Sequence, residues 1–175
     1  DSKMKSILFG LCHFHAVMLE RKLYGPMGYN MMYPFSIGDL RDSSVILANY
    51  MENSGGGKIP WADLRYLFGE IMYGGHITDP WDRRTNNTYL QVLLKDSIFT
   101  GEEMVPCRKG QKDAEGNLLP GLFFSPNPTE NDFSGYTKCI EENLPKEAPV
   151  LFGLHPNAEI GYLSNTTSML FASII

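Results

Sequence analysis

The chain has few cysteines, little charge and no long hydrophobic run. Its 175 residues include three cysteines and 20% charged residues, and the net charge is −5. The cysteines lie far apart without a CxxC pair, which suits a reducing compartment. The acidic balance argues against a nucleic-acid-binding domain, because such domains present a basic face. No run approaches the roughly 18 apolar residues of a membrane span. We therefore expect neither nucleic acid nor a membrane among the partners.

Motifs that carry chemistry are also missing. No G-x-x-x-x-G-K-[ST] loop is present to hold nucleotide phosphates, and the segment Gly55–Lys58 reads as a flexible turn. His13 and His15 are two residues apart, whereas a metal pair on a helix needs a spacing of four, so we expect one in the core or an interface and the other in solvent. No Ser-His-Asp or Cys-His arrangement has support. We expect no catalytic residue, no metal site, no cofactor and no enzyme activity in this chain alone.

What the sequence does have is helical periodicity in residues 1–96. Apolar side chains recur every three or four residues, and Gly or Pro punctuates the pattern. Four helices with short connections predict a small bundle, stabilised by burial of its apolar faces. The first helix runs from Lys3 to about Gly25, the second starts at Ser36 or Asp39 and stops at Gly55, the third opens at Pro60 and closes at Gly74, and the fourth opens at Pro80 after an Asp79 cap.

The segment 27–35, between the first two helices, is rich in methionine and aromatic residues. It is too apolar for a solvated loop, so we expect it to lie extended across the helices or against another domain. Its aromatic side chains Tyr29, Tyr33 and Phe35 are therefore candidate interdomain contacts.

The densest polar cluster surrounds the start of the fourth helix. We expect Trp81 to be a buried structural anchor between helices, because its large ring dominates local burial. Asp82 and one of Arg83 and Arg84 should form an ion pair or cap, and the other arginine should be free to reach a neighbouring domain. A capped helix start with two solvated arginines is the alternative. Asp82, Arg83 and Arg84 are therefore further candidate interdomain contacts.

Residues 97–175 show a different, less regular pattern. A short hairpin is expected from segments 103–105 and 118–124, and a short helix from Ser134 to Asn143, capped by Ser134 or Asp132. A final helix reads from Thr166 to Ile175 and stops in mid-pattern, which suggests a piece of a longer protein. The predicted fold class is thus mainly α, a small helical bundle followed by an irregular region with a short hairpin and one or two short helices.

Seven blocks of the sequence stand out along most of the chain. They are ILFGLCHFHA at 7–16, ERKLYGPMGYN at 20–30, YPFSIGDL at 33–40, DLRYLFGEIMYGGHITD at 63–79, WDRR at 81–84, ENLP at 142–145 and GLHPNAEIG at 153–161. In this order they resemble dynein heavy chains. There are three departures: the family usually has Trp where Tyr29 stands, it usually has Asp where Pro80 stands, and residues 95–131 match nothing closely.

The resemblance implies the helical lid of the sixth AAA+ module in residues 1–96 and an insert with the start of the C-terminal region in 97–175. It is greatest for axonemal heavy chains. The segment would be non-catalytic, packing the AAA+ ring and transmitting conformational change, with ATP and Mg bound elsewhere in the parent motor. Its partners would be neighbouring AAA+ modules, dynein complex subunits and, through the parent chain, microtubules, in the cytoskeleton of a ciliary or flagellar axoneme. The alternative is an independent helical protein-interaction module that docks a partner through 27–35.

Overall fold

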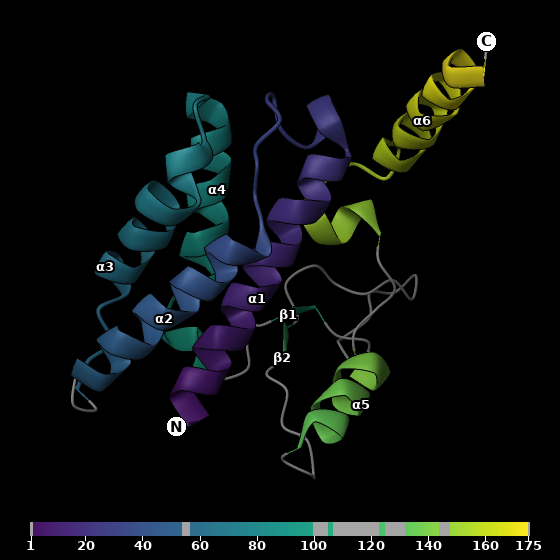
Figure 1. Ribbon diagram of the computed structural model, residues 1–175. Helices are drawn as coiled ribbons and strands as arrows, with labels where there is room; N and C mark the ends of the chain where they lie inside the picture. The colour runs from purple at the N-terminus through teal and green to yellow at the C-terminus, as the bar shows by residue number, and fades with distance from the viewer. Residues whose placement is uncertain are drawn as a thin grey trace, which may run out of the picture.

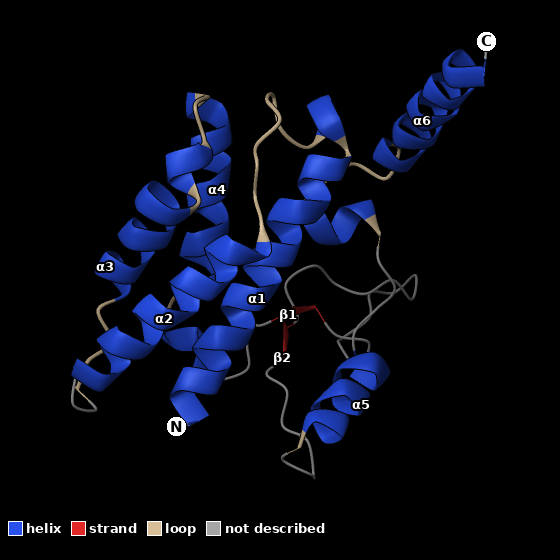
Figure 2. Ribbon diagram, in the orientation of Figure 1, coloured by secondary structure: helices blue, strands red, loops and turns tan. Residues whose placement is uncertain are grey.

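Most of the chain outside the insert is described in the computed structural model shown in Figures 1 and 2. The turn expected at Gly55 and most of the insert at 97–131 lie outside the described residues. No helix within the described part is long and apolar enough to cross a membrane. The described residues are 2–53, 57–99, 105–106, 123–124, 132–143 and 148–174.

The first two helices form as the sequence predicts. Helix α1 spans Ser2–Leu23, and the chain turns at Gly25, whose φ of 54° is in the left-handed region that favours glycine. Helix α2 spans Ile37–Asn53. Its start is stabilised by Asp39, whose Oδ2 accepts the backbone N–H of Ser36 at 2.8 Å, the reciprocal half of a capping box. Between them lies a short 3-10 turn, Gly25–Met27.

The third helix changes its winding partway. Helix α3 spans Trp61–Tyr66 and continues into a π-helical turn, Leu67–Met72. There the N–H of Tyr73 bonds to the carbonyl of Phe68 at 3.0 Å, five residues back instead of four. The carbonyl of Gly69 is thereby freed from the helical ladder. A 3-10 turn, Gly74–His76, follows before helix α4, Pro80–Leu93.

Helices α1 to α4 pack around one core, with α1 in contact with both α2 and α4. The segment 27–35, which we call the crossing segment, lies extended across these helices, and its aromatic rings point inward. Tyr29, Tyr33 and Phe35 are 3%, 3% and 4% exposed, and their ring centroids lie 5.5 to 5.9 Å apart. The expectation that these three side chains contact another domain is therefore wrong, because they complete this chain's own core.

The second half also keeps the expected elements. Strands β1, Val105–Pro106, and β2, Phe123–Phe124, pair antiparallel, which confirms the hairpin. Helix α5 spans Phe133–Asn143 and is capped by Asp132, whose Oδ1 accepts the N–H of Gly135 at 2.7 Å. Two 3-10 turns, Asp96–Phe99 and Pro149–Phe152, precede and follow this region.

The last helix, α6, spans Ala158–Ile174, so it begins earlier than the expected Thr166. It projects away from the bundle, as Figure 1 shows. Ile98, Phe152 and Leu154 belong to the same core as α1 to α4. The core therefore draws on both halves of the chain, and the division between 1–96 and 97–175 stays a prediction.

Candidate interdomain surface

Asp82 fastens the crossing segment to the start of α4. Its side chain is only 5% exposed and accepts the backbone N–H groups of Asn30 at 3.1 Å and Met31 at 3.3 Å. The hydroxyl of Tyr33 donates to the same carboxylate at 2.7 Å. Hydrogen bonds to charged groups are stronger than neutral ones. Asp82 thus binds backbone and tyrosine of its own chain, not Arg83 or Arg84 as expected.

Asp79 is the helix cap that the sequence predicts. Its Oδ1 accepts the N–H groups of Trp81 at 2.8 Å and Asp82 at 3.0 Å, and the side-chain amide of Asn30 at 3.3 Å. The hydrogen bond from the Asp82 backbone is the largest of the effects that hold the pKa of Asp79 below its usual value. The first turn of α4 and the crossing segment are therefore fixed to each other twice.

Arg83 forms the ion pair within the chain. Its Nη1 donates to Oε2 of Glu70 at 2.7 Å, and its Nη2 donates to the carbonyl of Ile77 at 2.5 Å. The other oxygen of Glu70 accepts the amide of Asn87 at 2.7 Å. Hydrogen bonds from Asn87 and Arg83 lower the pKa of Glu70. Of the two arginines, Arg83 is thus the one that binds the π-helical turn, through Glu70.

A buried amide explains how the π-helical turn is tolerated. Asn86 is 0% exposed, and its Nδ2 donates at 3.1 Å to the Gly69 carbonyl that the π-helical turn leaves free. A Cβ on Gly69 would meet Oδ1 of Asn87, so a larger residue there would have to displace the Asn87 side chain that binds Glu70. Glycine at 69 and a polar residue at 86 are therefore parts of one packing arrangement.

Trp81 and Arg84 lie on the outside of this junction. Trp81 is 66% exposed, so the prediction of a buried anchor is wrong. Asp82, Asn86, Leu90 and Leu93 form the buried face of α4. Trp81 therefore points outward, away from the core. The guanidinium of Arg84 lies 5.4 Å from the centroid of the Trp81 ring, a cation–π contact on the surface.

Two methionines of the crossing segment are also exposed, close in the chain to the backbone groups that bind the start of α4. Met31 and Met32 are 54% and 76% exposed, and the Met31 N–H is bound by Asp82, the neighbour of Trp81. We call Met31, Met32, Trp81 and Arg84 the α4 patch. It combines flexible thioethers, an indole and one exposed cation, residue types that suit a protein–protein contact.

Arg21, at the end of α1, joins segments that are distant in sequence, which the sequence pattern does not reveal. Its guanidinium donates to the carbonyls of Phe152 and Gly28, each at 2.8 Å, and to the hydroxyl of Tyr89 at 3.2 Å. Basic residues are common in the last turn of any helix, so Arg21 reads there as part of a polar helix end. Its partners up to 131 residues away could not be found from local sequence.

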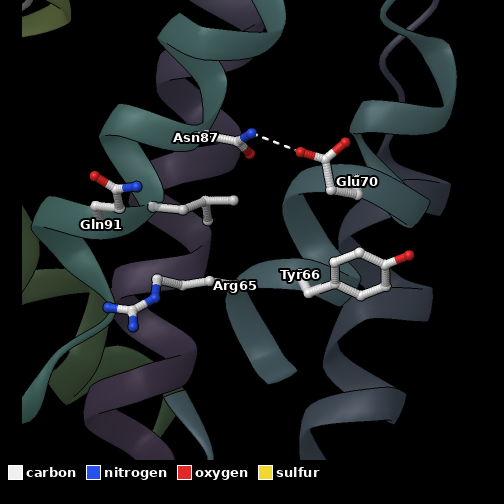
Figure 3. A pocket seen from close by; sticks show the side chains of 6 residues that line it. Arg65, Tyr66, Glu70, Asn87 and Gln91 are labelled. Carbon is white, nitrogen blue, oxygen red and sulfur yellow. Dashed lines mark hydrogen bonds between the residues drawn. The ribbon is translucent and has the colours of Figure 1, made fainter. Parts of the chain in front are cut away.

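A shallow cavity of about 180 Å³ lies between α3 and α4 and is open to solvent. Figure 3 shows Glu70 and Asn87 pointing toward each other across it, with Arg65, Tyr66 and Gln91 around them. Within the described part of the chain, no three His, Cys, Asp or Glu side chains gather as metal ligands would. Two of its polar groups, Glu70 and Asn87, bind each other, and Arg65 donates to the carbonyl of Leu94.

Two histidines are held by neighbouring side chains. Nδ1 of His15 lies 2.9 Å from the Tyr73 hydroxyl, and His15 is 5% exposed, in line with one histidine in the core. Nε2 of His76 lies 2.9 Å from Oδ1 of Asp39. Burial raises the pKa of Asp39, but hydrogen bonds from His76 and the Ser36 backbone outweigh it, so that the pKa is lowered.

We expect the free energy of unfolding to fall as the pH drops below 6.5. Burial lowers the pKa of His13 from 6.5 to about 4, and it lowers the pKa of His15 against the opposing charge of Asp39. A histidine whose pKa is lower in the folded state binds more protons when unfolded, so its contribution is present above pH 6.5 and is lost as the pH falls through the folded value. Because His13 keeps some solvent contact, we expect a loss of about 1 kcal/mol by pH 5.

Urea unfolding at pH 7, 6 and 5 checks this expectation. His13→Gln should flatten the profile, whereas His155→Gln, at an exposed position, should leave it unchanged. A profile that stays level down to pH 4.5 and falls only below it would assign the acid sensitivity to carboxylates instead.

The helices α1 to α4, packed around one core, agree with the mainly α fold expected for a lid of the AAA+ type. The profile of the family described as dynein heavy chain AAA lid domain matches residues 4–158. The chain belongs to this family.

Curated relatives are dynein heavy chains of cilia and flagella. The chain is 49% identical to dynein axonemal heavy chain 17 of Mus musculus and 49% identical to the ciliary dynein beta chain of Tripneustes gratilla, over 100% of its length in both cases. It is 40% identical, over 98% of its length, to the dynein alpha chain of the flagellar outer arm of Chlamydomonas reinhardtii. It spans about 4% of the length of each of these relatives.

Proposed function

We propose that this chain is a non-catalytic coupling segment of an axonemal dynein heavy chain, an ATP-driven microtubule motor. In this proposal it binds no cofactor of its own, and ATP and Mg are bound elsewhere in the parent motor. It packs the AAA+ ring of the motor in a ciliary or flagellar axoneme. Its direct partners are neighbouring AAA+ modules of the same heavy chain and other dynein complex subunits, and it reaches microtubules only through the parent chain.

The α4 patch is the observation that carries this proposal. Asp79, Asp82 and Arg83 are bound within the chain and hold the start of α4 in place. Trp81 and Arg84 are turned outward on that fixed base. A rigidly supported indole and guanidinium are the residue types that dominate binding energy in protein interfaces. We propose that this patch contacts the neighbouring module.

The test uses the full-length heavy chain. We expect Trp81→Ala and Arg84→Ala to slow microtubule-stimulated ATP turnover several-fold while basal turnover stays unchanged. Because both side chains are exposed, each change should alter the free energy of unfolding of the lid by less than about 1 kcal/mol. Arg41→Ala is the matched control, since Arg41 is an exposed arginine whose ion pair is with its neighbour Asp42. Stimulated turnover equal to that of the parent in both variants would contradict the proposal.

The alternative of an independent module that docks a partner through 27–35 has less support. The three aromatic side chains on which it depended are buried in the core. The large apolar side chains of the segment that stay exposed to a partner are those of Met27, Met31 and Met32.

A further inference from the structure

The end of the 3-10 turn Pro149–Phe152 is held against the bundle by one guanidinium. Nη1 of Arg21 donates to the carbonyl of Phe152 at 2.8 Å and lies 3.4 Å from that of Gly153. Nη2 donates at 2.8 Å to the carbonyl of Gly28, in the turn that follows α1. Arg21 therefore joins two turns that are far apart in the sequence.

Tyr89 on α4 completes this junction. Its hydroxyl accepts from Arg21 at 3.2 Å and donates to the Phe152 carbonyl at 2.7 Å. The guanidinium also lies 5.5 Å from the ring of Tyr29 and 5.6 Å from that of Tyr89. A planar fork of donors that also stacks on aromatic rings is a property of arginine that lysine lacks.

The backbone at Gly153 fits this junction closely. Its φ of 67° is in the left-handed region, and a Cβ there would lie 2.2 Å from the Tyr89 hydroxyl. Glycine is thus required both by the turn and by the approach to Tyr89. Four residues, Leu154 to Asn157, separate this glycine from the start of α6.

Other contacts fix only the first turns of α6. Ala158 is buried in the core, Gly161 lies against Met27, and the rings of Tyr162 and Tyr24 are 5.5 Å apart. Further along, its large apolar side chains Leu163, Leu170 and Phe171 are 55% to 63% exposed. Packing along the helix therefore contributes little to its orientation.

We propose that Arg21 is a positioning residue, which fixes the direction in which α6 leaves the bundle. Through its bonds to the Phe152 and Gly28 carbonyls, displacement of α1 is passed directly to the turn that precedes α6. That this displacement belongs to the working cycle of a motor rests on the proposed function. The role of Arg21 in orienting α6 does not rest on it, because the contacts that Arg21 makes lie within this chain.

The test measures the distance between spin labels on α4 and α6 in the full 175-residue chain. Labels are attached at Gln91→Cys and Thr167→Cys, both exposed positions, with the three native cysteines replaced by serine. The parent should give one narrow distribution, and Arg21→Ala should broaden it. Thr167 lies about 14 Å along α6 from Ala158, so a swing of about 20° at the base of the helix would displace the label by about 5 Å.

The variants separate positioning from charge and from stability. Arg21→Lys keeps the charge and loses the fork, so it should broaden the distribution as Arg21→Ala does. Tyr89→Phe removes one donor and should give a smaller broadening, and it keeps the test decisive if Arg21→Ala fails to fold. Arg41→Ala is the control and should match the parent. A narrow, unshifted distribution in folded Arg21→Lys and Tyr89→Phe would overturn the inference, whatever ATP turnover shows for the α4 patch.

Discussion

Gly74→Ala should lower the free energy of unfolding by about 3 kcal/mol, the cost of overpacking where nothing can move aside. A Cβ on Gly74 would lie 2.0 Å from the carbonyl oxygen of Gly69 and 2.7 Å from its carbon. Both are backbone atoms of the π-helical turn, so relief requires that the turn itself shifts. That shift would also disturb Asn86, which donates to the same carbonyl.

Gly75→Ala is the matched control, one residue further along the chain. A Cβ on Gly75 would meet nothing within 4 Å, and its φ is not among the positive values. Replacing such a glycine restricts the unfolded chain and is expected to raise the free energy of unfolding by about 0.4 to 1 kcal/mol.

Urea unfolding of both variants, followed by far-ultraviolet circular dichroism, measures the difference between their free energies of unfolding. If the two alanines change the free energy of unfolding equally, the close approach of Gly74 to the π-helical turn is wrong.

The starts of α2 and α4 could be predicted because their signals are local, whereas α6 begins eight residues before the expected Thr166. Asp79 followed by Pro80 specifies the start of α4, and Ser36 with Asp39 specifies the start of α2. In each case the donor and acceptor are within three residues of each other, so no knowledge of the fold is needed.

The orientation of α4 could not be predicted from hydrophobic periodicity. Periodicity selects Trp81 for the core, whereas the structure buries Asp82 and Asn86 instead. Tyr33 donates to the buried Asp82 carboxylate, and the Gly69 carbonyl accepts from the Asn86 Nδ2. Both partners are distant in sequence. A local sequence pattern therefore predicts such a polar residue to be exposed, although its distant partner allows it to be buried.

Local sequence also left the contacts of the crossing segment open. Its apolar composition correctly indicates that it packs against protein, but composition does not tell whether it packs against its own chain or another domain. The alternation of buried Tyr29, Tyr33 and Phe35 with exposed Met31 and Met32 depends on how the backbone is held. Asp82 holds it, through two backbone N–H groups.

Asp82→Ala should therefore lower the free energy of unfolding by about 3 kcal/mol, because it removes a buried hydrogen-bonded carboxylate and leaves three donors without their acceptor. The donors are the N–H groups of Asn30 and Met31 and the hydroxyl of Tyr33. Tyr33→Phe removes only the hydroxyl and should cost about 1 kcal/mol. Asp42→Ala, at an aspartate on α2 whose side chain is 57% exposed, is the control and should change little.

Two measurements are needed, because loss of stability alone would not show how the segment is held. Urea unfolding gives the free energies, and amide hydrogen exchange reports on the Asn30 and Met31 N–H groups directly. Under conditions where the bundle stays folded, exchange at both amides should accelerate in Asp82→Ala and stay slow in Tyr33→Phe, since the carboxylate remains in the second variant. Protection of both amides in Asp82→Ala would mean that the aromatic core, not Asp82, holds the crossing segment, and the α4 patch would lose its rigid base.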